Sequence, residues 1–277
     1  MPCSANCNTP IARSRSYCAD FMSIIAVFNQ KGGVGKTTTA LNLTAALQHS
    51  GRNPCAIDLD PQAQFSSISK VSARSGDDTL LSLFQRNRPL RDLLQPSPCG
   101  FNVIPSHTEL AKVDVLFGKG YNVVNRLHTA LRGEEFGTSP STSLIMDCSP
   151  MIGVLSLNAI FACDGLIVPI SADHLSLQGA IHIEKTLHAL EPVLKRRVKR
   201  RYLLTRFDRR RRMAGQVLEQ AQARFGKDVC QTCIAENVSL AESPALNQTV
   251  FEYAPDSRGA RDYAELLQEL LGNGFIE

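Results

Sequence analysis

Residues 30–38 read Gln-Lys-Gly-Gly-Val-Gly-Lys-Thr-Thr and lie between a short apolar run and a helical pattern. Glycines let backbone N–H groups wrap around phosphates, and the N-terminus of the following helix favours negative charge. Lys36 can reach the outer phosphates, and Thr37 can offer its hydroxyl to Mg²⁺. A ligand-free turn would not need paired lysines and tandem threonines, so we expect a phosphate site. Its predicted contacts are Lys31, Gly32, Gly33, Val34, Gly35, Lys36, Thr37 and Thr38.

Three aspartates at the ends of apolar runs could act on a metal ion or on water. Asp58 and Asp60 follow the run that begins at residue 54, and Asp147 follows residues 143–146. Carboxylates beside bound phosphate would repel it, so a role with Mg²⁺ or water is expected. For Asp58, capping of the following turn is an alternative that stays open.

The loop departs from the common phosphate-binding pattern, because Gln30 stands where glycine is usual and Lys31 adds a second lysine. It resembles the deviant Walker A motif of the ParA, MinD and nitrogenase-reductase superfamily of P-loop ATPases. The resemblance implies ATP and Mg²⁺ as cofactors and a homodimer that forms on ATP binding, in which Lys31 reaches the partner's nucleotide. It further implies that Asp60 positions the attacking water. The expected catalytic residues are Lys31, Lys36 and Asp60, and the expected metal residues are Thr37, Asp58 and Asp147.

Later segments extend this resemblance over residues 22–271. Asp147-Cys-Ser-Pro150 is similar to the Asp-Cys-Pro-Pro of the superfamily's second switch, with Ser149 in place of a proline. The segments 168–170 and 176–179 resemble parts that border the nucleotide, although plain strand and turn roles explain them equally. We therefore expect Pro169, Thr205 and Arg206 near the nucleotide.

The C-terminal part resembles the ParA branch, whose signature is similar to residues 236–244 and 253–260. The chain ends without a basic amphipathic helix, so membrane binding of the MinD type is disfavoured. Cys148 and Cys163 do not follow the iron–sulfur pattern of nitrogenase reductases. The resemblance implies a cytoplasmic protein that associates with the nucleoid and a ParB-like or cargo-adaptor partner that stimulates hydrolysis. An assembly or regulatory factor of the same fold, as in cellulose synthesis or flagellar number, is the alternative.

Positive charge is concentrated between Lys195 and Arg212, which include eleven bases and one acid. Of 30 bases and 26 acids in the chain, this leaves 19 and 25 elsewhere. Clustered cations bind a phosphate backbone without reading bases, which favours nonspecific DNA as a partner. A solvated helix end or a protein contact is the alternative. The predicted DNA residues are Lys195, Arg196, Arg197, Lys199, Arg200, Arg201, Arg209, Arg210 and Arg211.

These motifs need a scaffold that brings strand ends together. A length of 277 residues and a hydrophobic share of 43% suit one large α/β domain. Alternating apolar runs and helical patterns predict a doubly wound, mostly parallel sheet with helices on both faces. Predicted strands span residues 23–28, 54–58, 101–104, 143–147, 165–169, 201–204 and 227–233. Predicted helices span residues 36–49, 80–94, 122–132, 156–161, 176–190, 209–225 and 258–271.

The first 21 residues are predicted to be a disordered extension, and residues 22–277 the ATPase domain. The leader contains Cys3, Cys7 and Cys18 but little apolar periodicity, and it lacks the pattern of a secretory signal. We therefore expect reduced cysteines. Cys230-Gln-Thr-Cys233 has redox or zinc spacing, but no second Cys or His pair lies near it, so structural thiols are predicted.

Overall fold

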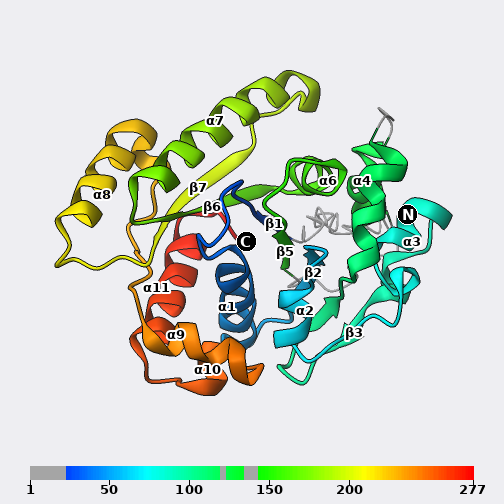
Figure 1. The fold of residues 1–277 in the computed structure, drawn as a ribbon, viewed down its shortest axis with the longest axis horizontal. Coiled ribbons are helices and arrows are strands. Elements are labelled where there is room, and N and C mark those ends of the chain that lie inside the picture. The colour runs from blue at the N-terminus through cyan, green and yellow to red at the C-terminus, as the bar shows by residue number, and fades with distance from the viewer. Residues whose placement is uncertain (1–22, 119–122, 134–142) are drawn as a thin grey trace, which may run out of the picture.

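The computed structural model describes residues 23–118, 123–133 and 143–277. Within these ranges, seven strands form one sheet in the order β3-β4-β2-β5-β1-β6-β7 (Figure 1). The strands are β1 Ile24–Val27, β2 Cys55–Leu59, β3 Gln95–Pro96, β4 Asn102–Ile104, β5 Leu144–Cys148, β6 Gly165–Ser171 and β7 Lys199–Thr205. Only β3 is antiparallel to its neighbour. The prediction of a doubly wound, mostly parallel sheet is confirmed.

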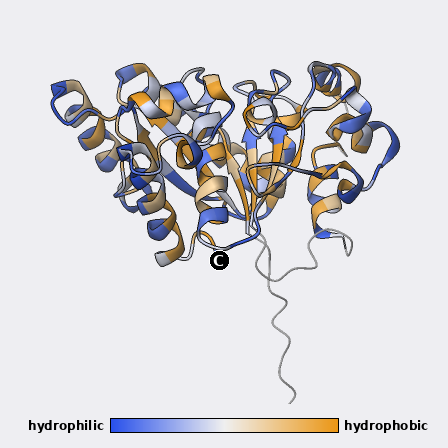
Figure 2. Cartoon of the chain, turned by 90° about the horizontal axis from the view of Figure 1, so that it is seen from below, coloured by the Kyte–Doolittle hydropathy of each residue, from blue (hydrophilic) through white to orange (hydrophobic). Residues whose placement is uncertain are grey.

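Helices cover both faces of this sheet (Figures 1 and 2). The helices are α1 Lys36–His49, α2 Gln64–Ile68, α3 Leu80–Arg86, α4 Lys112–Phe117, α5 Arg126–Arg132, α6 Val154–Ala162, α7 His174–Leu194, α8 Arg212–Phe225, α9 Val238–Glu242, α10 Val250–Tyr253 and α11 Arg258–Gly272. The helices α1, α2, α10 and α11 bury side chains against one face. The helices α3 to α8 bury theirs against the other. Within the described ranges, no helix is long and apolar enough to cross a membrane.

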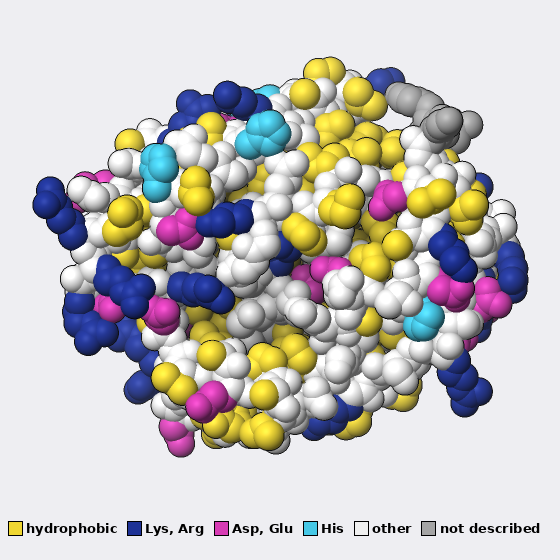
Figure 3. Space-filling model, viewed as in Figure 1, with side chains coloured by type: hydrophobic (Ala, Val, Ile, Leu, Met, Phe, Trp, Pro, Cys, Tyr) yellow, Lys and Arg dark blue, Asp and Glu magenta, His cyan; other side chains and the backbone are white. Residues whose placement is uncertain are grey.

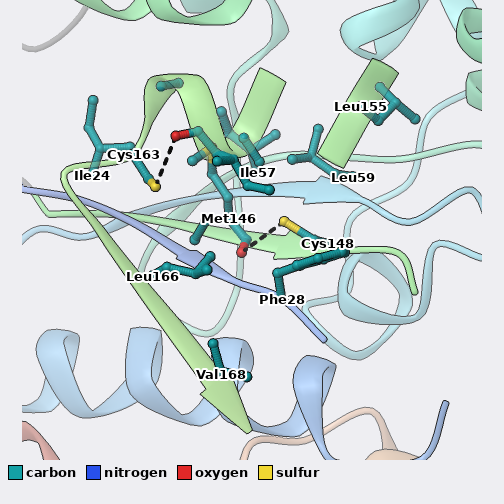
Figure 4. Close-up of a cluster of buried hydrophobic side chains, with 14 of the residues drawn as sticks. Ile24, Phe28, Ile57, Leu59, Met146, Cys148, Leu155, Cys163, Leu166 and Val168 are labelled. Carbon is teal, nitrogen blue, oxygen red and sulfur yellow. Dashed lines mark hydrogen bonds between the residues drawn. The ribbon is translucent and has the colours of Figure 1, made fainter. Parts of the chain in front are cut away.

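The central strand β1 shows how the sequence produces these two cores. Ile24 and Ala26 belong to one core, and Ile25 and Val27 belong to the other. Successive strand side chains point to opposite faces, so a strand that is covered on both sides reads as an unbroken apolar run. Cys148 and Cys163 lie among these apolar side chains as free thiols (Figure 4).

Two predicted elements are wrong. Residues 227–233 were expected to form a strand, but they begin in a short 3-10 turn and meet β7 at one isolated bridge, between Val229 and Tyr202. The reason is competition, because the Glu269 carboxylate accepts the backbone N–H groups of Gln231 and Thr232 at 2.8 Å each. The helix predicted over residues 80–94 ends at Arg86, since Asn87 adopts φ 54° and Pro89 follows it.

Other predicted elements agree within a few residues, and the N-terminal prediction has no structural outcome. The expected extension at residues 1–21 and the start of the helix predicted at residue 122 lie outside the described residues. The helices α2, α4, α9 and α10 were not predicted, because each has only four to six residues and shows little periodicity.

Candidate nucleotide site

The phosphate loop lies where β1 ends and α1 begins, at the carboxyl edge of the sheet. Gly33 and Gly35 have φ angles of 75° and 85°, in a left-handed region that other residues adopt at a cost. No acidic side chain lies in the first turn of α1, so the helix dipole at this end is free to favour an anion. The predicted loop therefore has the backbone that phosphate binding requires.

Lys36 is buried at the start of α1 and bridges the loop. Its Nζ donates a hydrogen bond to the Lys31 carbonyl at 2.9 Å. Burial lowers the pKa of Lys36, and the neighbouring carboxylates of Asp147 and Asp60 oppose this effect. A phosphate at the loop would provide further negative charge for this buried cation.

Asp147 extends from β5 and is the least satisfied charged group of the site. The residue is 1% exposed, and among the described residues neither carboxylate oxygen has a hydrogen-bond partner of good geometry. Burial, and then repulsion from Asp58, raise the pKa of Asp147 well above its usual range, whereas Thr37 and Lys36 act in the opposite direction. An unpartnered buried carboxylate is the arrangement that a cation or its bound water would complete.

The residues fit Mg²⁺, but they do not form a cage for it. Within the described ranges, no group of three or more His, Cys, Asp or Glu side chains is placed to hold a metal ion. Mg²⁺ commonly keeps several waters and binds through one or two protein groups together with phosphates. Thr37 and Asp147 are therefore the residues that would hold it, directly or through water.

Asp58 lies beside Asp147 in the paired register of β2 and β5, yet its environment differs. One oxygen accepts hydrogen bonds from the Ser66 backbone N–H at 2.9 Å and the Ser66 hydroxyl at 2.6 Å. The other oxygen accepts the Asp60 N–H at 3.0 Å. Burial raises the pKa of Asp58 to about 6, although these hydrogen bonds favour the charged form. The geometry favours the turn-capping alternative, and its metal role stays a prediction.

Asp60 is held by this turn at the mouth of the site. It is partly exposed, and its carboxylate accepts the Gln62 N–H at 3.0 Å. Asp58 helps to fix the backbone that carries the Asp60 carboxylate. The structure thus brings Lys36, Asp60 and Asp147 together, as the sequence predicted.

Lys31 turns back onto its own chain. Its Nζ lies 2.7 Å from the Asp173 carboxylate and 2.9 Å from the Ser176 hydroxyl. Asp173 also caps α7 by accepting the Ser176 N–H. Partial burial acts to raise the pKa of Asp173, but the hydrogen bonds from Lys31, Ser171 and Ser176 prevail and hold it well below its usual range. In this conformation the Lys31 ammonium is bound within its own chain.

Thr205 forms a hydrogen bond to the loop, and Pro169 accepts one from Asn29, the residue before the loop. The Asn29 amide donates to the Pro169 carbonyl at 2.6 Å, so this carbonyl already has a donor. The Thr205 hydroxyl donates to the Val34 carbonyl at 2.9 Å and so joins the end of β7 to the phosphate loop. Arg206 follows in a left-handed conformation with an exposed side chain.

A cavity of about 280 Å³ opens beside the phosphate loop. We call it the base cavity. It is lined by Gly35, Thr38, Thr205, Arg206, Ile234, Ala235, Glu236, Asn237, Leu240, Ala241 and Tyr263. Thr205 and Arg206 were predicted to lie near the nucleotide, and this stays a prediction. The residues from 234 to 241 and Tyr263 were not assigned to the nucleotide, although the resemblance at residues 236–244 was the signal that could have identified them.

The structure divides the predicted basic surface between opposite edges of the sheet. Residues 195–201 lie before and at the start of β7, and residues 206–212 follow its end. The seven residues of β7 separate them by roughly 20 Å. The nine predicted DNA residues therefore do not lie in one cluster, and their binding to DNA stays a prediction.

Three of the predicted DNA residues before or at the start of β7 are buried or half-buried and hold internal contacts. Arg196 donates to the Cys163 carbonyl at 2.6 Å and caps the end of α6. Arg200 is 3% exposed and pairs with Glu191, and Arg201 pairs with Asp228. These three arginines stabilise the amino edge of the sheet. Of the same group, Lys195, Arg197 and Lys199 are exposed there.

Similarity to known proteins agrees with this geometry. The family model described as "AAA domain" matches residues 22–200. The chromosome-partitioning ATPase Soj of Thermus thermophilus is 36% identical over 89% of this chain and 94% of its own length. The chromosome partitioning protein ParA of Myxococcus xanthus is 33% identical over 90% of this chain and 87% of its own length.

Solved structures share the fold. Cobyrinic acid a,c-diamide synthase from Mycobacterium smegmatis, with bound ADP and magnesium, has a TM-score of 0.76 and 25% identity over 91% of this chain and 94% of that one. An McdA–ATP complex from Cyanothece has a TM-score of 0.78 and 19% identity over 91% of this chain and 96% of that one.

Without nucleotide and Mg²⁺, removal of the Asp58 carboxylate and removal of the Asp147 carboxylate should have opposite effects on the stability of the fold. Asp58→Ala leaves buried N–H groups without an acceptor and should lower the free energy of unfolding by about 3 kcal/mol. Asp147→Asn removes an unpartnered charge and should preserve or raise stability. Because burial raises the pKa of Asp147 in the folded state, its ionisation destabilises the fold as pH rises above the usual Asp range.

The advantage of Asp147→Asn over the wild type should therefore be absent at acidic pH and largest near neutral pH. Urea denaturation across pH measures both variants. Loss of stability in Asp147→Asn equal to that in Asp58→Ala would contradict the distinction.

Proposed function

The chain belongs to the ParA family of partitioning ATPases, and on this basis we propose that it binds ATP with Mg²⁺, dimerises, holds DNA nonspecifically and releases it after hydrolysis. A ParB-like or cargo-adaptor protein would stimulate the hydrolysis step. One observation carries the proposal: Thr205 joins the phosphate loop to the strand end from which an arginine-rich loop departs. A nucleotide at the loop and a polyanion at the arginines would thus act on the same edge of the sheet.

Nucleotide binding rests on the residues that surround the loop. A triphosphate would lie against the backbone N–H groups of residues 32–37 with Lys36 beside its outer phosphates. Mg²⁺, when bound, would neutralise phosphate charge. Thr37 and Asp147 would hold it, and Asp60 would accept a hydrogen bond from the attacking water and orient it. The ADP and magnesium bound to the related synthase support this assignment.

Dimerisation depends on where Lys31 points. To reach a nucleotide in a second subunit, this lysine must leave Asp173 and Ser176, which hold it within its own chain. The pair is partly exposed, with side-chain exposures of 32% and 45%, so its disruption costs little. ATP binding and dimer contacts would compete with this internal contact.

DNA binding is assigned to residues 206–212, which we call the arginine loop. It includes Arg206, Arg209, Arg210, Arg211 and Arg212, and all five side chains are exposed. Figure 3 shows Lys and Arg side chains gathered beside acidic ones at the left of the view, over the connection between β7 and α8. The loop follows Thr205 directly, whereas the exposed cations at residues 195–199 lie at the edge remote from the nucleotide. Control of DNA binding by ATP therefore favours the arginine loop.

The alternative is an assembly factor of the same fold that does not act through DNA. It would use the same nucleotide site and dimer, and the exposed arginines would face a protein or solvent. Binding of DNA to the ATP-loaded protein separates the two.

Asp173→Asn should release Lys31 while preserving the cap of α7, because Asn caps helices as well as Asp. With ATP present, the variant should dimerise at a protein concentration about two- to tenfold lower, from one weakened ion pair in each subunit. Analytical ultracentrifugation measures this shift. In a Lys31→Ala background the same change should have no effect, and unchanged or weaker dimerisation of Asp173→Asn alone would contradict the internal restraint.

Charge reversal should separate the two edges of the sheet. Arg209→Glu and Arg212→Glu, each measured with ATP across a salt series, should lower DNA affinity at least tenfold. Each should also flatten the slope of log affinity against log salt by about two, since a dimer loses two phosphate contacts. Arg197→Glu and Lys199→Glu make the same charge change at the opposite edge and should stay within about threefold of the wild type.

ATP-driven dimerisation should persist in all four variants. If Arg197→Glu and Lys199→Glu lost DNA affinity and the variants of the arginine loop kept it, the DNA site would lie at the opposite edge. Absence of DNA binding by the unmodified ATP-bound protein would favour the assembly factor.

A further inference from the structure

Glu236 stands between two cavities on the carboxyl edge of the sheet. One is the base cavity. The other, which we call the arginine cavity, has a volume of about 510 Å³ and is lined by Phe207, Asp208, Arg209, Arg210, Arg211, Cys233, Ala235, Glu236 and Arg258. The two cavities share Ala235 and Glu236. Glu236 is thus the charged side chain common to both walls.

The carboxylate of Glu236 is engaged with the arginine loop in this structure. Its Oε2 lies 3.0 Å from Nη2 of Arg211. Asp208 binds Arg210 through two contacts of 3.0 Å and lies 3.5 Å from Arg211. Acidic side chains of the chain therefore occupy two arginines at positions that phosphate oxygens could take. Arg209 and Arg212 form no ion pair with any described residue.

Hydrogen bonds hold the backbone just before Glu236, so the side chain can change its partner without a movement of the backbone. Asp262 accepts the Ala235 N–H at 2.7 Å, and the Phe207 N–H donates to the Ile234 carbonyl at 3.0 Å. These contacts tie the residue before Glu236 to α11 and to the start of the arginine loop. The Glu236 side chain itself is about half exposed. A change of partner needs a rotation of one side chain rather than a movement of the fold.

The chemistry of a purine base supplies the competing partner. The exocyclic amine of adenine is a hydrogen-bond donor, and an ionised carboxylate is an acceptor that can serve either this amine or a guanidinium. A base in a cavity of 280 Å³ lies against its wall, of which Glu236 is part. A base bound there would therefore compete with Arg211 for one carboxylate.

We propose that Glu236 is exchanged between Arg211 and the nucleotide base, so that nucleotide binding releases Arg211 to the phosphate backbone of DNA. The inference rests on the proposed function. It adds a way in which nucleotide affects DNA binding within one subunit. Without nucleotide, Glu236 and Asp208 stand in for phosphate and weaken the loop's attraction for DNA. With nucleotide, Arg211 becomes available before any second subunit binds. By thermodynamic linkage, the pairing of Arg211 with Glu236 must also weaken nucleotide binding.

The first experiment removes the charge of Glu236 with little change of shape. Without nucleotide, Glu236→Gln should bind duplex DNA about two- to fivefold more tightly than the wild type, as expected for loss of one partly exposed ion pair. With saturating ATP and Mg²⁺, the DNA affinities of Glu236→Gln and the wild type should become equal. Glu219→Gln removes the same charge from an exposed position on α8 without an ion pair to the described residues, and it should behave as the wild type.

Equal DNA affinity of Glu236→Gln and the wild type without nucleotide would overturn the exchange. An increase that persists unchanged with ATP would also overturn it, because Glu236 would then act only as a repelling surface charge.

The second experiment needs no DNA. Arg211→Gln leaves Glu236 without its guanidinium partner and should tighten binding of a fluorescent ADP analogue by about two- to fivefold, with no such gain in a Glu236→Gln background. Unchanged ADP affinity in Arg211→Gln would refute competition for the carboxylate. If no form of the protein binds DNA, the proposed function fails, and the ADP titration alone decides whether Glu236 is shared.

Discussion

Asp147 carries a carboxylate that the fold buries with no well-formed hydrogen bond from a described residue, and the rest of the site is arranged around this group. Burying an ionised carboxylate costs several kcal/mol unless a cation or hydrogen bonds compensate. Lys36 supplies part of the compensation, and Asp58 adds repulsion from the adjacent strand. The site therefore favours a bound cation, and Mg²⁺ that arrives with a triphosphate is the group that its donors fit. The parallel sheet imposes this constraint, because it brings the ends of β1, β2 and β5 to the same edge.

The carboxyl edge of the sheet also brings residues from far along the chain next to the phosphate loop. β7 ends at Thr205, whose hydroxyl holds the Val34 carbonyl, and the arginine loop starts at the next residue. Glu236 lies across from this point and contacts Arg211. Lys31 binds Asp173, the N-cap residue of α7, in the connection that follows β6. These side-chain pairs are weak, and a modest binding free energy is enough to shift the population of such pairs.

The sequence predicts the nucleotide site better than the surfaces around it. Residues 30–38 define their own geometry, because glycines at a strand-to-helix junction determine the backbone locally. The positions of Asp60 and Asp147 follow from the rule that parallel strands end at one edge. Residues 195–212 do not form one basic surface, because β7 separates the two halves of this segment. The density of charge along the sequence cannot reveal this separation. Arg196 and Arg200 are polar residues that the sequence places in the same run, yet they satisfy internal carbonyl and carboxylate groups.

Residues 227–236 show a second limit of sequence analysis. Their β-like composition gave no sign that Glu269, far along the chain, would take their N–H groups, or that Glu236 would lie between two cavities. The central claim of the account is that the nucleotide controls the arginine loop from the same edge. It is tested most directly by DNA affinity of the unmodified protein at one fixed salt concentration without nucleotide, with ADP and with ATP, each with and without Mg²⁺. The account predicts the tightest binding with ATP and Mg²⁺ together and the weakest without nucleotide, and equal affinity in all states would contradict it.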